Sequence, residues 1–143
     1  MRRIHLLRVA EEAEVYRPLL VAAGEAGLRV GWLELQAPPP PPPTLSGALA
    51  AGSERAVAVG ESWTLAARAR KGPARLRELL RQQFLGCTLV LVRGEADAPS
   101  LVAADDGMWH VTIPGGSERR YGTDQLAAAL REPRPFAPAE PVT

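Results

Sequence analysis

Short runs of hydrophobic residues, each five or six positions long, alternate along the chain with stretches that carry apolar residues at helical spacing. Continuous apolar runs of this length are typical of strands that are buried on both faces of a sheet. The runs that predict the parallel core of a sheet cover residues 4–9, 30–35, 55–59 and 88–92. Apolar residues at helical spacing predict one helix that begins near Arg17 and another that begins at Pro73.

The pattern changes to hairpins in the last third of the chain. Asp105-Asp106-Gly107 is a strong turn signal between two short apolar runs, and Gly115-Gly116 marks a second turn. Thr123 is expected to cap the last helix. An earlier hairpin turn is predicted at Gly60-Glu61-Ser62, because apolar and polar residues alternate from Trp63 onward. Since Trp63 belongs to the inward set of that alternation, its ring is expected to pack in the core.

Together these elements predict an α/β fold in a single domain, residues 1–132, with a mixed, partly parallel sheet of about five to seven strands. Helices are expected on the faces of the sheet, and the C-terminal third is expected to be rich in hairpins. The proline run at 38–43 favours extended polyproline II, which indicates a stiff connector rather than a docking peptide. The proline-rich residues 133–143 are expected to form an unstructured tail.

Composition narrows the class of protein. The 143 residues contain no apolar run near the roughly 20 residues that a membrane helix needs, so a soluble, cytoplasmic protein is expected. A single cysteine, Cys87, excludes a disulfide framework. A formal charge of +1 argues against a surface built throughout to meet nucleic acid. The cations are 16 arginines and Lys71 alone, and asparagine is absent, which suits a heat-adapted source or a GC-rich genome equally.

The strongest candidate site is a cluster of cations that spans a strand, a loop and the start of a helix. The residues expected to bind a ligand are Arg68, Arg70, Lys71, Gly72 and Arg75. Arg68 and Arg70 are expected on the polar face of the strand. The helix expected from Pro73 would point free backbone N–H groups toward the loop. A phosphate or carboxylate there would meet forked guanidinium groups and a positive helix end. The alternative interpretation is a solvated helix face beside an arginine-rich edge strand.

Few other residues form a pattern with recognised chemistry. The loop Val9–Glu12 lacks the glycines of a dinucleotide site, and its carboxylates would repel a phosphate. Cys87 and His110 occur in the chain order of a thiol nucleophile and its base, but spacing alone does not bring them together. Asp105 or Asp106 would be the acid that orients the imidazole, although the turn explains both residues.

These observations predict a small binding module for an anionic ligand: a phosphorylated metabolite, a nucleotide or a nucleic-acid phosphate. A non-catalytic protein-interaction or structural subunit is the alternative, and an enzyme of unknown class comes third. His5 and His110 lie far apart without a second ligand type at metal-binding spacing, so no metal is expected, and no cofactor motif occurs. The expected partner is a small anionic ligand or another protein, with nucleic acid less favoured and no membrane. The sequence leaves the oligomeric state open.

Overall fold

The computed structural model describes residues 4–35, 43–70, 72, 73 and 75–136, and the chain divides into two compact units. The larger unit comprises Met1–Gln36 and Leu80–Thr143, and the smaller unit comprises Ala37–Leu79. α3 (Leu76–Gln83) contains the boundary between them. None of the described helices is long and apolar enough to cross a membrane.

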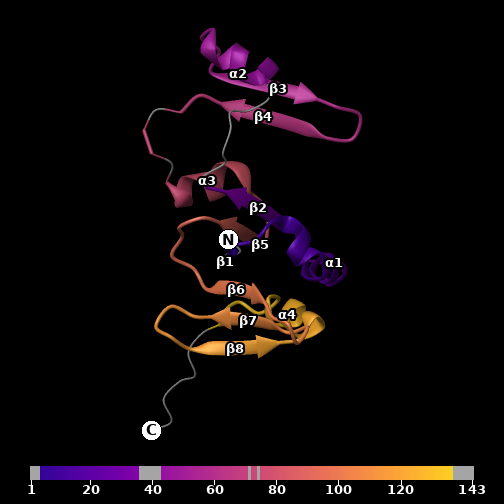
Figure 1. Cartoon of the computed structure of the whole chain (residues 1–143). Coiled ribbons are helices and arrows are strands. Elements are labelled where there is room, and N and C mark those ends of the chain that lie inside the picture. Colours follow the sequence, from indigo (N-terminus) through magenta and orange to yellow (C-terminus); the bar gives the residue numbers. More distant parts are fainter. Residues whose placement is uncertain (1–3, 36–42, 71, 74, 137–143) are drawn as a thin grey trace. The chain divides into compact units, whose positions relative to one another are not determined.

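The larger unit is built around a mixed sheet of six strands in the order β2-β5-β1-β6-β7-β8 (Figure 1). Its strands are β1 (His5–Val9), β2 (Val30–Glu34), β5 (Leu89–Arg93), β6 (Ser100–Ala103), β7 (Trp109–Thr112) and β8 (Glu118–Tyr121). β1, β2 and β5 pair in parallel, β6 continues in parallel beside β1, and β6, β7 and β8 form antiparallel hairpins. β5 lies between β1 and β2, and four of its five residues are fully buried, as expected for a strand covered on both faces.

Two sequence signals explain where α1 (Arg17–Glu25) begins and ends. Pro18 occupies the first turn of this helix, where no backbone N–H is needed, directly after the short 3-10 helix η1 (Ala13–Tyr16). Gly27 follows the helix with φ +85°, a left-handed conformation that glycine adopts without strain and that commonly ends helices. The observed start at Arg17 agrees with the sequence prediction.

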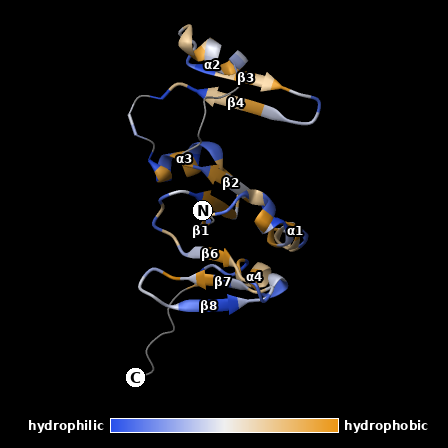
Figure 2. Ribbon diagram, in the orientation of Figure 1, coloured by the Kyte–Doolittle hydropathy of each residue, from blue (hydrophilic) through white to orange (hydrophobic). Residues whose placement is uncertain are grey.

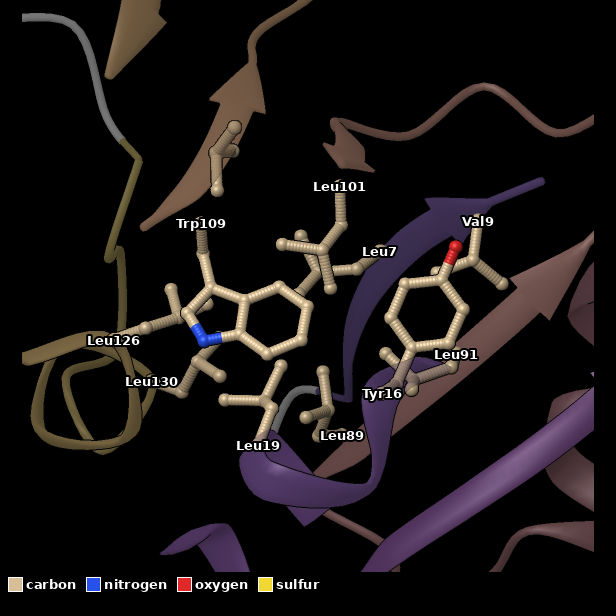
Figure 3. Close-up of a cluster of buried hydrophobic side chains, with 11 residues drawn as sticks. Leu7, Val9, Tyr16, Leu19, Leu89, Leu91, Leu101, Trp109, Leu126 and Leu130 are labelled. Carbon is tan, nitrogen blue, oxygen red and sulfur yellow. The ribbon is translucent and has the colours of Figure 1, made fainter. Parts of the chain in front are cut away.

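One face of the sheet carries the main hydrophobic core (Figure 3). α1 and α4 (Thr123–Ala129) lie against each other and cover this face. The buried cluster consists of Leu7, Val9, Tyr16, Leu19, Leu89, Leu91, Leu101, Trp109, Val111, Leu126 and Leu130. The rings of Tyr16 and Trp109 stack with their centroids 6.0 Å apart, and Nε1 of Trp109 donates to Oγ1 of Thr123 at 2.9 Å. The expectation that Thr123 caps α4 is therefore wrong: its hydroxyl serves the indole, and Gly122 occupies the N-cap position.

The smaller unit consists of α2 (Pro43–Ala50) and a hairpin of β3 (Arg55–Val59) and β4 (Thr64–Arg68). The hairpin is a separate antiparallel sheet of two strands, so the expectation that residues 55–59 join the parallel core is wrong. The exposure of β3 alternates along the strand, with half-buried alanines between exposed arginine and valine residues. A central strand of a parallel sheet must be buried on both faces, and β3 buries only one.

The predicted fold class is confirmed: the chain has an α/β fold with a mixed, partly parallel sheet of six strands, helices against the sheet and hairpins in the C-terminal third. The expected connector at 38–43 lies outside the described residues except for Pro43, the first residue of α2. The expected tail is described as far as Phe136, whose ring lies edge-on to Tyr121 with centroids 6.1 Å apart. Residues 137–143 lie outside the described part of the chain.

Candidate functional site

Four of the five residues expected to bind a ligand are described, and they follow one another in the smaller unit. Arg68 is the last residue of β4, Arg70 and Gly72 lie in the segment after it, and Arg75 directly precedes α3. All four are exposed. Lys71 lies outside the described residues, so its part in the cluster stays a prediction.

The start of α3 differs from the expectation. The helix begins at Leu76 rather than at Pro73, and the carbonyl of Arg75 accepts the N–H of Leu79 at 3.0 Å. Glu78 lies in the first helical turn, where its carboxylate already faces the positive end of the helix. An anion at this helix start would compete with that carboxylate. The arginines, rather than the helix, are therefore the stronger part of the predicted cluster.

The pairing of β3 with β4 places two arginines directly opposite each other. The turn at 61–62 closes with the N–H of Gly60 donating to the carbonyl of Trp63 at 2.8 Å. Hydrogen-bonded and non-hydrogen-bonded pairs alternate outward from this turn, which makes Arg55 and Arg68 a non-hydrogen-bonded pair. Opposed side chains lie closest together in such a pair, and both point to the same face of the hairpin.

The face that carries this arginine pair is exposed. Because side chains alternate along a strand, it carries Arg55, Val57, Val59, Thr64, Ala66 and Arg68, and we call it the open face. Val57 and Val59 expose 53% and 77% of their surfaces. α2 packs against the other face of the hairpin, where Ala56, Ala58 and Ala67 are half-buried. Figure 2 colours β3 and β4 mainly in pale orange. On the open face, Val57, Val59 and Ala66 lie beyond the arginine pair toward the turn.

The smaller unit is more basic than the chain as a whole. Ala37–Leu79 contains six arginine or lysine residues and three acidic residues, an excess of three positive charges. The larger unit has an excess of two negative charges, which is why the formal charge of the complete chain is only +1. Clustered charge of one sign raises the local concentration of oppositely charged ligands.

Sequence reasoning did not single out Arg55, because residues 55–59 are apolar enough to predict a buried strand. The signal that finds it is the turn: a two-residue turn at 61–62 pairs position 55 with position 68. The expectation that Trp63 packs in the core is also wrong, since 58% of its surface is exposed. Its ring lies against Gly60, where an added side-chain carbon would meet a ring atom at 2.4 Å. Among the described residues of the smaller unit, Leu45 is the one large buried side chain, which is too little to enclose an indole.

A hollow of about 770 Å³ lies in the larger unit at the amino ends of its parallel strands. Its lining includes His5, Thr88, Arg131 and Arg134. The last turns of α1 and α4 end beside it, and the partial negative charge of their carbonyl groups opposes an anion. Ligands of open α/β sheets generally bind at the carboxyl ends of the strands instead. The open face is therefore the better candidate for anion binding.

The carboxyl ends of the parallel strands are occupied by internal contacts. Glu34 at the end of β2 accepts a hydrogen bond from Nε1 of Trp32 at 2.9 Å and pairs with Arg93 of β5 at 3.4 Å. In the loop after β1, the N–H of Glu11 donates to the hydroxyl of buried Tyr16 at 3.1 Å. A nucleotide fold presents the N–H groups of this loop to a phosphate. Here the protein itself uses one of them.

The thiol and the imidazole considered as a nucleophile pair lie in different parts of the sheet. Cys87 precedes β5 and lies against Gly31 of β2, where an added side-chain carbon would be 3.4 Å from its Sγ. His110 is on β7, which β1 and β6 separate from β5 by about 14 Å of strand spacing. The structure does not bring these two residues together. Within the described ranges, no group of three or more His, Cys, Asp or Glu residues could hold a metal ion.

His110 lies instead between two carboxylates at the hairpin end of the larger sheet. Its Nδ1 is 3.2 Å from Oε1 of Glu118, and its Nε2 is 3.7 Å from Oδ2 of Asp106. Asp106 accepts the N–H of Met108 at 2.9 Å, and this hydrogen bond, with support from the charges of His110 and Arg120, holds the pKa of Asp106 below its usual value. The cluster secures the turn predicted between β6 and β7.

Fold and site together define an α/β protein with a small, basic β-hairpin unit. No family model and no curated protein matches the sequence. Two solved structures of MobB from Bacillus subtilis resemble the fold. One has a TM-score of 0.48 and 21% identity over 68% of this chain and 66% of that chain, and the other has a TM-score of 0.46 and 20% identity over 68% and 63%. The chain thus spans less than two thirds of either MobB chain. Likeness at this level bears on the fold alone.

Proposed function

We propose that the smaller unit binds an anionic group, a phosphoryl group or a carboxylate, between Arg55 and Arg68. The observation that carries the proposal is their register: the two residues are direct cross-strand neighbours on the open face. Arg70 and Arg75 follow on the same exposed segment and would add charge around a bound anion. Lys71 and Gly72, between them, belong to the proposed site on the strength of the sequence.

The like charge of the two opposed residues supports this assignment. Like charges directly opposite each other destabilise a β pair, by a few tenths of a kcal/mol to about 1 kcal/mol. A bound anion changes the sign of this interaction, because each guanidinium group can direct parallel N–H groups at the same oxygens. Both side chains are exposed, so an anion in solution has access to them.

The experiment is a titration of the full chain with sodium pyrophosphate, followed by the backbone amide chemical shifts of β3 and β4. The double variant Arg55→Gln/Arg68→Gln keeps a polar side chain at both positions and removes both charges. It should weaken binding at least tenfold, about 1.4 kcal/mol. Binding to the wild type should also weaken as salt rises, since an exposed site is screened.

The matched control is Arg131→Gln/Arg134→Gln, which removes two exposed arginines from the hollow in the larger unit. This control should bind pyrophosphate as the wild type does. If it loses binding while Arg55→Gln/Arg68→Gln keeps it, the anion site lies in the hollow and the proposal is wrong. If neither the wild type nor any variant binds pyrophosphate, the proposal also fails.

A further inference from the structure

The open face extends well beyond the arginine pair. Val57 and Val59 continue from Arg55 along β3, and Ala66 lies across from Val57. These side chains point away from α2 and are exposed. A small anion at the arginine pair would leave this aliphatic surface in contact with water. Burying apolar surface is favourable by roughly 25 cal/mol for each Å², so a ligand that also covers the valines would bind more tightly. The ligand that fits the whole face has an apolar part as well as a charge.

The smaller unit also lacks the cover that a two-stranded sheet needs. Isolated hairpins are marginally stable and are normally completed by further strands or by a packed helix. In the described part of Ala37–Leu79, the only large side chain that is buried is Leu45 of α2, with 3% of its surface exposed. α2 therefore completes one face, and the other remains suited to a partner.

Charge indicates what kind of partner this is. A second copy of the unit would bring a second excess of three positive charges against the first. A nucleic acid would match the charge, but exposed bases bind by stacking on aromatic rings, and the open face carries valine, alanine and threonine in their place. A segment of protein that combines acidic and aliphatic residues matches both parts of the face.

Building on the anion site proposed above, we infer that the open face docks an extended acidic and aliphatic segment of another protein. Side chains on one face of an extended segment recur every two residues, about 6.6 Å, which is also the spacing of Arg55, Val57 and Val59 along β3. A segment with a glutamate followed by valines at alternate positions thus places its carboxylate at the arginine pair. Its valines then lie against Val57 and Val59.

The test uses the full chain and a fluorescein-labelled peptide of sequence Glu-Ser-Val-Ser-Val-Ser, with binding measured by fluorescence anisotropy. The double variant Val57→Thr/Val59→Thr keeps the β-branched shape of both residues, so the hairpin is retained. It should weaken peptide binding about tenfold and leave pyrophosphate binding unchanged. The control Val102→Thr alters a valine of β6 with the same 53% exposure as Val57 and should have no effect.

Three comparisons separate the outcomes. If Arg55→Gln/Arg68→Gln abolishes pyrophosphate binding but Val57→Thr/Val59→Thr leaves peptide binding unchanged, the anion site stands and the docking inference is overturned. The inference is also overturned if a thymidine dodecanucleotide binds more tightly than the peptide and is insensitive to the valine changes, because the face then serves nucleic acid. If the wild type binds neither pyrophosphate nor the peptide, the proposed function fails together with the inference. A peptide with Lys in place of Glu should not bind.

Discussion

The two units of the chain bury their side chains to very different extents. In the larger unit, helices and strands enclose a cluster of eleven buried residues, in which Leu89 and Leu91 are fully buried. In the smaller unit, the described residues bury one large side chain, Leu45, and leave two valines more than half exposed. Stability in proteins is concentrated where apolar contacts are dense, and surfaces available for binding are drawn from the rest. The comparison therefore indicates that folding stability is concentrated in the larger unit, and the proposed binding surface lies in the smaller one.

The largest test of this comparison removes one leucine from each unit. Leu91→Ala should lower the free energy of unfolding by about 2–5 kcal/mol, because it leaves a cavity in a fully enclosed core. Leu65→Ala on β4, where 39% of the side chain is exposed, should have less than about 1 kcal/mol of effect. Hydrogen exchange of the amides of β5 measures the effect in the larger unit, and exchange of the amides of β3 and β4 measures it in the smaller unit. Equal effects of the two variants would mean that the hairpin contributes to the same cooperative core.

The larger unit could be predicted from the sequence because its signals are local and agree with one another. The run 88–92 is apolar enough to be a central strand, and Pro18 and Gly27 locate both ends of α1. The run 55–59 is also largely apolar, but it forms a strand of the separate two-stranded sheet. A short apolar stretch does not reveal whether it is covered on one face or two, because this depends on which elements pack against it in the fold, here α2 on one face.

The candidate site could be predicted only in part for the same reason. Arg68, Arg70 and Arg75 lie within eight positions of one another, so the sequence alone shows that they form a cluster. Arg55 lies thirteen positions before Arg68 and becomes its neighbour through the turn at 61–62. The assignment of residues 55–59 to the parallel core conceals this pairing, although the turn predicted at Gly60-Glu61-Ser62 implies a partner strand after it. The prediction that a helix begins at Pro73 is wrong, since α3 begins at Leu76. Proline is compatible with the first turn of a helix but does not by itself start one.

A second pair of variants tests how tightly each unit is packed around a glycine. An added carbon at Gly31 of β2 would meet ring atoms of Phe84 at 2.5 and 2.8 Å, and one at Gly60 would meet the ring of Trp63 at 2.4 Å. Gly31→Ala should destabilise the larger unit by about 1–3 kcal/mol, because Phe84 is partly enclosed. Gly60→Ala should have a smaller effect, since the exposed indole can move aside into solvent.

Thermal unfolding and amide spectra of both glycine variants provide the measurement. The comparison is weakened if Gly60→Ala disturbs the protein more than Gly31→Ala, because Trp63 would then be held in place by more than its contact with Gly60. Chemical-shift changes in Gly60→Ala should remain within β3, β4 and the turn that joins them.

The third test compares one hydrogen bond between a side chain and the backbone in each unit, and smaller effects are expected. Tyr16→Phe removes the hydroxyl that accepts the N–H of Glu11 in a partly buried setting, and it should lower the free energy of unfolding by about 1 kcal/mol. Ser53→Ala removes the hydroxyl that donates to the carbonyl of Arg55 at 2.6 Å on the exposed hairpin. Water can replace that donor, so the effect should be a few tenths of a kcal/mol. Urea unfolding of both variants checks the order, and an equal or larger effect of Ser53→Ala would contradict it.

The smallest expected effect concerns the hairpin end of the larger sheet, which resembles the smaller unit in its exposure. The N–H of Met108 donates to the Asp106 carboxylate, and with the nearby charges of His110 and Arg120 this holds the pKa of Asp106 below the usual 3.8. Because the pKa in the folded state is the lower one, the carboxylate stabilises the fold at pH values above 3.8, and this contribution is lost as the pH falls through the folded-state pKa. Asp106→Asn keeps an oxygen that can accept the N–H of Met108 but cannot titrate.

The free energies of unfolding of the wild type and Asp106→Asn, measured between pH 2 and pH 7, isolate this contribution. The difference in free energy of unfolding between the wild type and Asp106→Asn should be constant at neutral pH. It should shrink below about pH 4, where Asp106 becomes protonated first in the unfolded and then in the folded protein. A difference that stays constant down to pH 2 would show that the hydrogen bond from Met108 does not favour the charged form of Asp106. The charge of Asp106 would then contribute nothing to the stability of the turn, and the contact of His110 with Glu118 would remain as an ion pair of this hairpin end.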